Sequence, residues 1–315
     1  MSGFELYAPR DVRHRRTWTA AAIPLTVVFI VLATFPVAIC ALVLHIPLQT
    51  GVDWRADAYQ LYGFIFIYGV FFLWLWAFER RGPATIGFSG PALMRYLRGL
   101  AIGGGFLVAV VGTIWALGGY RMESAGFWGQ PGLAAFAPVI VLLGGFMVQG
   151  GAEEVATRGY LMQVVSSRHG IVWGIVANTV VFSVLHALNI PSSPELLLGL
   201  VNILLVGVFL SLYAVHERSL WGVCAWHSAW NWLLGVGFGL RVSGETLDVS
   251  PLFVHLGETA KAPWWLSGGH FGPEGSVVTS LVLLMGTAYL LYKGALRPEN
   301  SHSATESGPS TGASA

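Results

Sequence analysis

Two adjacent glutamates and an arginine lie within an apolar stretch long enough to cross a lipid bilayer. Glu153, Glu154 and Arg158 interrupt an otherwise uncharged run over residues 133–165. Even on a lenient scale, a charged side chain at the bilayer centre costs about 2.5–3.5 kcal/mol. These three side chains must therefore be paired or solvated. The spacing of Glu154 and Arg158 predicts an i,i+4 ion pair, but that pair alone gives Glu153 no role.

The composition is that of a membrane protein. Only 10% of the residues are charged and 55% are hydrophobic, whereas soluble domains usually carry about 25% charged residues. The formal net charge of +1 gives no reason to expect a nucleic-acid partner. Cys40 and Cys224 both fall in apolar runs without metal-ligand spacing, so we expect small core residues in contact with neither a metal nor each other.

Apolar runs of suitable length predict an all-α bundle of about eight transmembrane helices. The predicted spans cover residues 18–45, 59–78, 96–117, 133–165, 171–188, 196–215, 220–240 and 277–291. They form one transmembrane domain, residues 18–294, between a basic N-terminal segment, residues 1–17, and a tail, residues 295–315. The tail is rich in serine, threonine and glycine, which predicts disorder.

The distribution of basic residues predicts the orientation of these spans. With both termini on the cytoplasmic side, the cytoplasmic segments contain twelve of the seventeen Lys and Arg residues and the outer segments contain four. Arg158 lies within the membrane. This bias is the one that the positive-inside rule describes. We therefore expect a multi-pass protein of a bacterial cytoplasmic membrane with both termini inside.

Two other spans contain polar residues at helical spacing. Phe182 and His186 are four residues apart in the fifth span, and His227 and Asn231 are four apart in the seventh, so each pair shares one helix face. At a rise of about 1.5 Å per residue, the polar groups lie roughly 10–22 Å from the predicted cytoplasmic ends. They are expected to meet in one cavity, within residues 133–240, that opens to the cytoplasm.

These motifs resemble those of a known protease family. Glu-Glu-x-x-x-Arg, Phe-x-x-x-His and His-x-x-x-Asn, each on its own apolar span and in this order, are similar to those of the CPBP family, the CAAX protease and bacteriocin-processing (Abi) group. The matching residues are Glu153, Glu154, Arg158, Phe182, His186, His227 and Asn231. The resemblance implies an eight-helix intramembrane endopeptidase. One branch removes the last three residues after a prenylated cysteine, and some bacterial members are linked to bacteriocin immunity or processing.

A protease of this kind needs no serine or cysteine nucleophile, because a carboxylate can activate water. We expect Glu153 to act as general base and then as acid, and Arg158 to hold Glu154 ionised and oriented. His186 would share the water with Glu153, while His227 and Asn231 would donate to the oxyanion. The substrate, a membrane protein or lipidated peptide, is expected to contact Phe182, Trp226 and Trp230. Helix packing explains the two tryptophans equally well.

Three alternatives stay open at the level of sequence. Glu153, His186 and His227 could instead hold a catalytic zinc ion with Glu154 as base. We favour a cofactor-free reaction, because the chain has no His-Glu-x-x-His motif and Arg158 places a positive charge nearby. The polar set could also stabilise a non-catalytic scaffold or immunity factor. A transporter would use the same cavity as an ion site, but no inverted repeat supports it.

Overall fold

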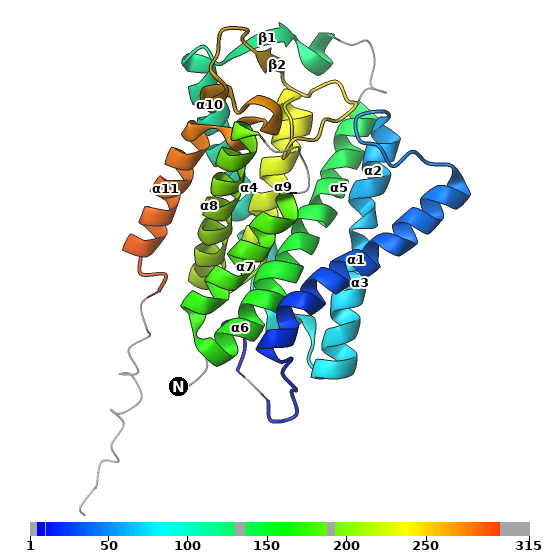
Figure 1. Cartoon of the computed structure of the whole chain (residues 1–315), viewed down its shortest axis with the longest axis vertical. Coiled ribbons are helices and arrows are strands. Elements are labelled where there is room, and N and C mark those ends of the chain that lie inside the picture. Colours follow the sequence, from blue (N-terminus) through cyan, green and yellow to red (C-terminus); the bar gives the residue numbers. More distant parts are fainter. Residues whose placement is uncertain (1–4, 10, 130–135, 188–192, 297–315) are drawn as a thin grey trace, which may run out of the picture.

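The computed structural model describes residues 5–9, 11–129, 136–187 and 193–296, and within them the chain is a helical bundle (Figure 1). Most helices run along the long axis of the molecule. The longer α-helices are α1 (Thr19–Leu44), α4 (Ala92–Ala116), α5 (Phe136–Glu154), α7 (Ile171–His186), α8 (Pro194–Glu217), α9 (Trp221–Trp232) and α11 (Val277–Tyr292). The shorter ones are α2 (Trp54–Gly63), α3 (Ile65–Trp74), α6 (Met162–His169) and α10 (Trp264–Ser267). The all-α prediction is confirmed.

Five helical segments are long and apolar enough to cross a membrane. They are Thr19–Leu44, Trp54–Glu79, Ala92–Ala116, Phe136–His169 and Pro194–Glu217. The other three predicted spans are also helical but shorter: α7 and α11 have 16 residues each, and α9 continues into a π-helix, η6 (Leu233–Gly237). Large apolar side chains such as Phe35, Leu42 and Trp76 are exposed on the outward faces, where a bilayer would cover them.

Glycines allow the helices around the centre of the bundle to approach closely. An added Cβ at Gly103 of α4 would lie 2.5 Å from the carbonyl oxygen of Trp226 in α9. At Gly150 of α5, it would lie 3.1 Å from the backbone nitrogen of Ser228 in α9. Small residues at such contacts are typical of helix packing in membranes. They bring α9, with His227 and Asn231, against the part of α5 that contains the two glutamates.

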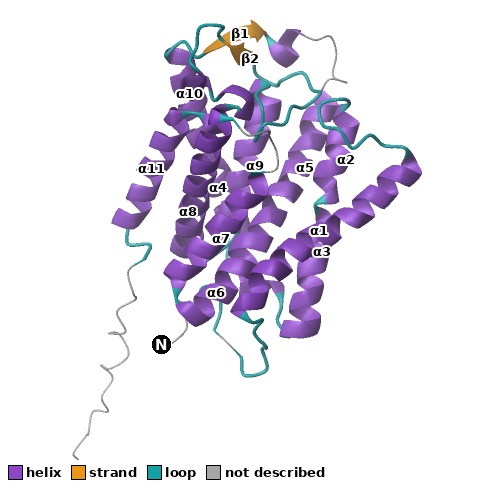
Figure 2. Ribbon diagram, in the orientation of Figure 1, coloured by secondary structure: helices purple, strands orange, loops and turns teal. Residues whose placement is uncertain are grey.

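The two ends of the bundle differ. Helix α1 begins and α11 ends at one end, whereas the loops around a two-stranded sheet cover the other (Figures 1 and 2). Strands β1 (Tyr120–Ser124) and β2 (His255–Glu258) pair antiparallel there. Much of the predicted outer loop, residues 241–276, is therefore folded and packs over the bundle. The predicted disorder of the tail beyond residue 296 lies outside the described residues.

The N-terminal segment packs onto the bundle at the end where α1 begins. Leu6 is buried, and the hydroxyl of Tyr7 donates to the backbone carbonyl of Arg158 at 3.2 Å. The guanidinium of Arg16 donates to the carbonyl of Ser167 at 2.9 Å. Burial raises the pKa of the Tyr7 hydroxyl well above its usual value, which keeps it protonated and able to donate. This segment therefore closes the bundle beneath the charged residues.

Candidate active site

The two glutamates lie where the helix geometry changes. Helix α5 ends at Glu154 and continues as a π-helix, η5 (Val155–Leu161), which contains Arg158. Wider turns of this kind are rare and often occur at functional sites. The two glycine pairs of this span, Gly144-Gly145 and Gly150-Gly151, both lie in continuous α-helix. The irregularity instead begins directly after the two carboxylates.

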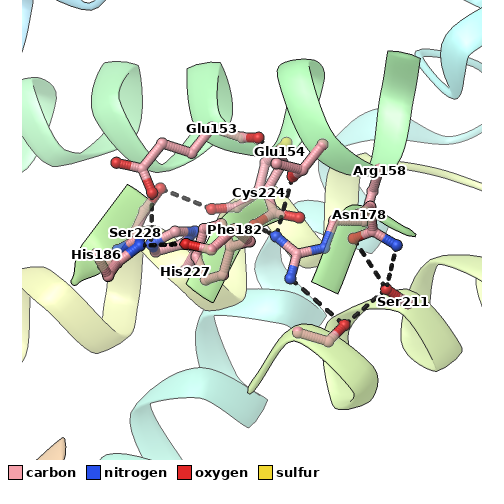
Figure 3. A network of polar contacts seen from close by, with 12 residues as sticks. Glu153, Glu154, Arg158, Asn178, Phe182, His186, Ser211, Cys224, His227 and Ser228 are labelled. Carbon is pink, nitrogen blue, oxygen red and sulfur yellow. Dashed lines mark hydrogen bonds and ion pairs between the residues drawn. The ribbon is translucent and has the colours of Figure 1, made fainter. Parts of the chain in front are cut away.

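Glu154 is fully buried and joins a cation to a histidine. Its Oε1 atom lies 2.9 Å from Nη1 of Arg158 and 2.9 Å from Nδ1 of His227 (Figure 3). Because a carboxylate only accepts, Nδ1 of His227 is the donor in this pair. Arg158 is also fully buried, lies over the ring of Phe182 and reaches the carbonyl of Gly207 in α8. Glu154 is thus held directly from two helical elements, η5 and α9, while Arg158 is in turn contacted from α7 and α8.

Glu153 has different surroundings from its neighbour. Its Oε1 accepts a hydrogen bond of 2.6 Å from the amide of Gln149, one turn earlier in α5. The oxygen of that amide accepts from Nδ2 of Asn231 at 3.1 Å. Two successive hydrogen bonds, from Asn231 to Gln149 and from Gln149 to Glu153, therefore fix the carboxylate. The other oxygen, Oε2, lies 3.7 Å from Nε2 of His227 and has no hydrogen-bond partner among the described residues.

His186 enters the same region from the end of α7. Its Nδ1 donates to the backbone carbonyl of Phe182 at 2.8 Å, because a carbonyl oxygen only accepts. In a neutral ring, Nε2 then carries the lone pair. The Phe182 ring lies between the two histidines, with its centroid 4.5 Å from that of His186 and 6.1 Å from that of His227. Phe182 therefore positions both rings by packing.

These side chains line one cavity of about 480 Å³. It contains Glu153, His186, His227 and Asn231, and its walls include Phe182, Trp226 and Trp230. The two indoles are stacked with centroids 5.0 Å apart. Arg158 and Glu154 do not line it but lie behind His227 and Phe182. The described structure thus brings all nine sequence-predicted site residues together: four are polar groups at the cavity surface, three are aromatic residues of its walls, and two form a buried pair behind them.

The expectation that the cavity opens at the end of the bundle that holds the N-terminal segment is wrong. Its lining extends instead to Thr50, Glu245 and Glu274, which belong to loops at the opposite end. The end of the bundle where α1 begins is closed by the buried Arg158 and by Tyr7. Residue depths could not reveal this, because groups near the midplane can face either way and the loops that complete the walls are remote in sequence.

The cavity also has polar residues that were not anticipated, among them Gln149 and Glu274. Gln149 is an uncharged amide in an apolar span, one turn before Glu153, and that spacing could have identified it. Glu274 comes from the outer loop and gave no such signal. It is buried, and its carboxylate accepts from Nε1 of Trp230 at 3.1 Å and from the backbone nitrogen of Ser243 at 2.5 Å. Burial raises the pKa of Glu274, which the hydrogen bonds from Ser243 and the nearby His186 partly oppose.

The donor atoms do not converge on a metal position in this arrangement. Within the part of the chain that the structure describes, no three His, Cys, Asp or Glu side chains are placed to share an ion. For His227, Nδ1 already bonds to Glu154, and for His186, Nδ1 bonds to Phe182. A zinc-binding form would use the Nε2 atoms of both rings together with Glu153, and it would need these groups to move closer together.

Comparison with known families identifies the segment that contains these residues. Residues 134–233 match the family described as type II CAAX prenyl endopeptidase Rce1-like. No curated protein and no solved structure shows a significant match to the chain. The matched segment includes all three motifs, from Glu153 to Asn231, and the apolar helices around them have the length of membrane spans. This match supports the resemblance to CAAX-type proteases that the three motifs gave, and the apolar helices are those of a multi-pass membrane protein.

Proposed function

We propose that this chain is an intramembrane endopeptidase in which Glu153 activates water to hydrolyse a peptide bond of a membrane-associated protein or peptide. The contrast between two adjacent carboxylates supports the assignment. Glu154 is fully buried and bound by Arg158 and His227, whereas Glu153 is partly exposed and lines the cavity.

The first half of the reaction uses the free oxygen of Glu153. A water molecule between this carboxylate and Nε2 of His186 or His227 gives its proton to Glu153, and its oxygen attacks the scissile carbonyl carbon. The carbonyl oxygen then becomes an oxyanion. We assign its stabilisation to His227 and Asn231, which line the same wall. Nδ1 of His227 is held by the Glu154 carboxylate, which stabilises the ring when it is positively charged.

The second half returns the proton. Glu153, now protonated, donates to the amine nitrogen as the carbon–nitrogen bond breaks, and the carboxylate is regenerated. The hydrogen bond from Gln149 keeps Oε1 fixed, so the same oxygen, Oε2, accepts and later donates the proton. The apolar wall, which includes Phe182, Trp226 and Trp230, would hold the hydrophobic part of a lipid-embedded substrate.

A comparison of protein termini in membranes tests the activity directly. Cells would produce wild type, Glu153→Gln or the control Glu123→Gln at matched levels, and C-termini of membrane proteins would be mapped by mass spectrometry. Glu123 lies on the surface strand β1, outside the cavity. New termini with wild type and Glu123→Gln, but not with Glu153→Gln, are expected. Identical termini in all three, with deletion phenotypes rescued by Glu153→Gln, would instead indicate a scaffold or immunity role.

Removal of metal ions distinguishes the proposed metal-free mechanism from a zinc-dependent one. The purified protein in nanodiscs would be assayed before and after dialysis against a chelator, with the residual zinc measured by mass spectrometry. The proposed mechanism predicts that cleavage persists at a metal content far below one ion per chain. Loss of cleavage that returns on addition of zinc, but not magnesium, would overturn the metal-free mechanism and favour a zinc site at Glu153, His186 and His227.

A further inference from the structure

A surface groove lies at the end of the bundle where α1 begins. Its volume is about 710 Å³, within the range of about 300–1,000 Å³ that is usual for small-molecule sites. None of the described residues that line the candidate active-site cavity takes part in it. The groove lies between the N-terminal segment and the end of the second predicted span, where α3 continues as a π-helix, η1 (Leu75–Glu79). Its lining consists of His14, Trp76, Ala77, Arg80, Arg81 and Gly82.

One apolar face of this span leads into the groove. Leu73, Trp76 and Arg80 follow one another at spacings of three and four residues, so they share one side of the helix. Leu73 is 61% and Trp76 is 74% exposed, and the segment Trp54–Glu79 is long and apolar enough to cross a membrane. Lipid chains would therefore cover this face. Because Arg80 directly follows the apolar segment, the face ends in a cation at the depth of the lipid headgroups.

The side chain of Arg80 is exposed and forms no hydrogen bond or ion pair with the described residues. The acid beside it, Glu79, is buried and accepts from Nε of Arg81 at 2.5 Å and from the hydroxyl of Thr17 at 2.6 Å. Glu5 of the N-terminal segment pairs with Arg16. These carboxylates are bound to other groups, so the positive charge of Arg80 remains available to an anion from outside the chain.

The charge around the groove is positive on balance. The described residues of the N-terminal segment, the end of η1 and the end of α6 include six arginines, Arg13, Arg15, Arg16, Arg80, Arg81 and Arg168, and three acids, Glu5, Asp11 and Glu79. Burial lowers the pKa of Arg16, and the positive charges of Arg168 and Arg81 act in the same direction. An anion bound in the groove would reduce the repulsion among these cations.

We propose that the groove binds the headgroup of an anionic phospholipid, with the phosphate on the guanidinium of Arg80 and the lipid chains along Leu73 and Trp76. A guanidinium can pair with phosphate through two parallel hydrogen bonds, which favours arginine at such a position. The apolar face distinguishes this ligand from a free anion, because it continues from the groove into the region of lipid chains. A lipid in this position joins the second span to the N-terminal segment at His14.

Native mass spectrometry of the full-length protein tests this binding. The protein in detergent would be titrated with phosphatidylglycerol and with phosphatidylcholine of identical chains, and the first bound lipid of each class would be quantified. We expect phosphatidylglycerol to bind about fivefold more tightly, the difference that one arginine near a membrane surface gives. Arg80→Gln should abolish this preference. Lys261→Gln removes an exposed cation of the outer loop, outside the groove, and should leave the preference unchanged.

Two further variants define how the lipid is held. Arg80→Lys keeps the charge but not the planar guanidinium, so part of the preference should remain, and this variant keeps the test decisive if Arg80→Gln does not fold. Trp76→Ala should weaken the binding of both lipids equally, because it removes only apolar contact.

Equal binding of the two lipids to the wild-type protein, or an unchanged preference in Arg80→Gln, would overturn the proposal. Displacement of the bound lipid by inorganic phosphate at constant ionic strength would do the same, because a soluble anion would then be the ligand. An Arg80-dependent dimer without bound lipid would assign the groove to a second copy of the chain and would also overturn it.

Discussion

Nδ1 of His227 lies 2.9 Å from Oε1 of Glu154, and this contact fixes the histidine ring with its other nitrogen toward Glu153. The same Glu154 oxygen pairs with Arg158 in a site with no exposure to solvent. Glu154 therefore holds the site together, while its neighbour Glu153 lines the cavity. The two carboxylates are adjacent in sequence but are expected to respond very differently to substitution.

Substitution of Glu153 should remove activity and leave the fold intact. Glu153→Gln keeps the shape of the side chain but not the general base, so cleavage is expected to fall by about 10²–10⁴-fold. The midpoint of thermal unfolding in detergent should stay close to wild type, because the side chain is 18% exposed and the hydrogen bond that Oε1 accepts from Gln149 can also form with an amide oxygen. A Gln variant that cleaves at the wild-type rate would contradict the role of Glu153.

Substitution of Glu154 should instead damage stability. Glu154→Gln leaves the guanidinium of Arg158 buried without a counter-charge, and breaking a buried pair in this way costs about 3–5 kcal/mol. Thermal unfolding should show a large decrease. The double variant Glu154→Leu/Arg158→Met removes both charges, so its loss should be well below the sum of the two single losses. Additive losses in this cycle would show that the two residues do not depend on each other.

The helical fold and the cluster of polar groups could be predicted from the sequence, because both depend on local spacing. Apolar runs define helices whatever their partners, and i,i+4 pairs such as His227 and Asn231 must share a face. The long-range contacts could not be predicted. The hydrogen bond between Asn231 and Gln149 joins residues 82 positions apart, and that between Trp230 and Glu274 joins residues 44 apart. The side on which the cavity opens depends on such contacts.

Gln149 is predicted to be a positioning residue. Gln149→Leu removes the donor that fixes Oε1 of Glu153, so kcat is expected to fall about tenfold while KM changes little. Asn231→Ala combined with Gln149→Leu should lower kcat by less than the product of the two single effects if Asn231 acts partly through Gln149. Steady-state kinetics on one cleaved peptide measure both quantities. A change in KM alone would assign Gln149 to substrate binding.

Tyr7 is predicted to stabilise the π-helical turn that contains Arg158. Tyr7→Phe removes a partly buried hydrogen bond to the carbonyl of Arg158, in the π-helical turn that follows the glutamates, and should cost about 1 kcal/mol of stability. Tyr62→Phe is a matched control, because its hydroxyl also donates to a backbone carbonyl, that of Val141, but the residue is exposed. Thermal unfolding should show a smaller effect for the control. Equal effects would show that the N-terminal segment gives no special support.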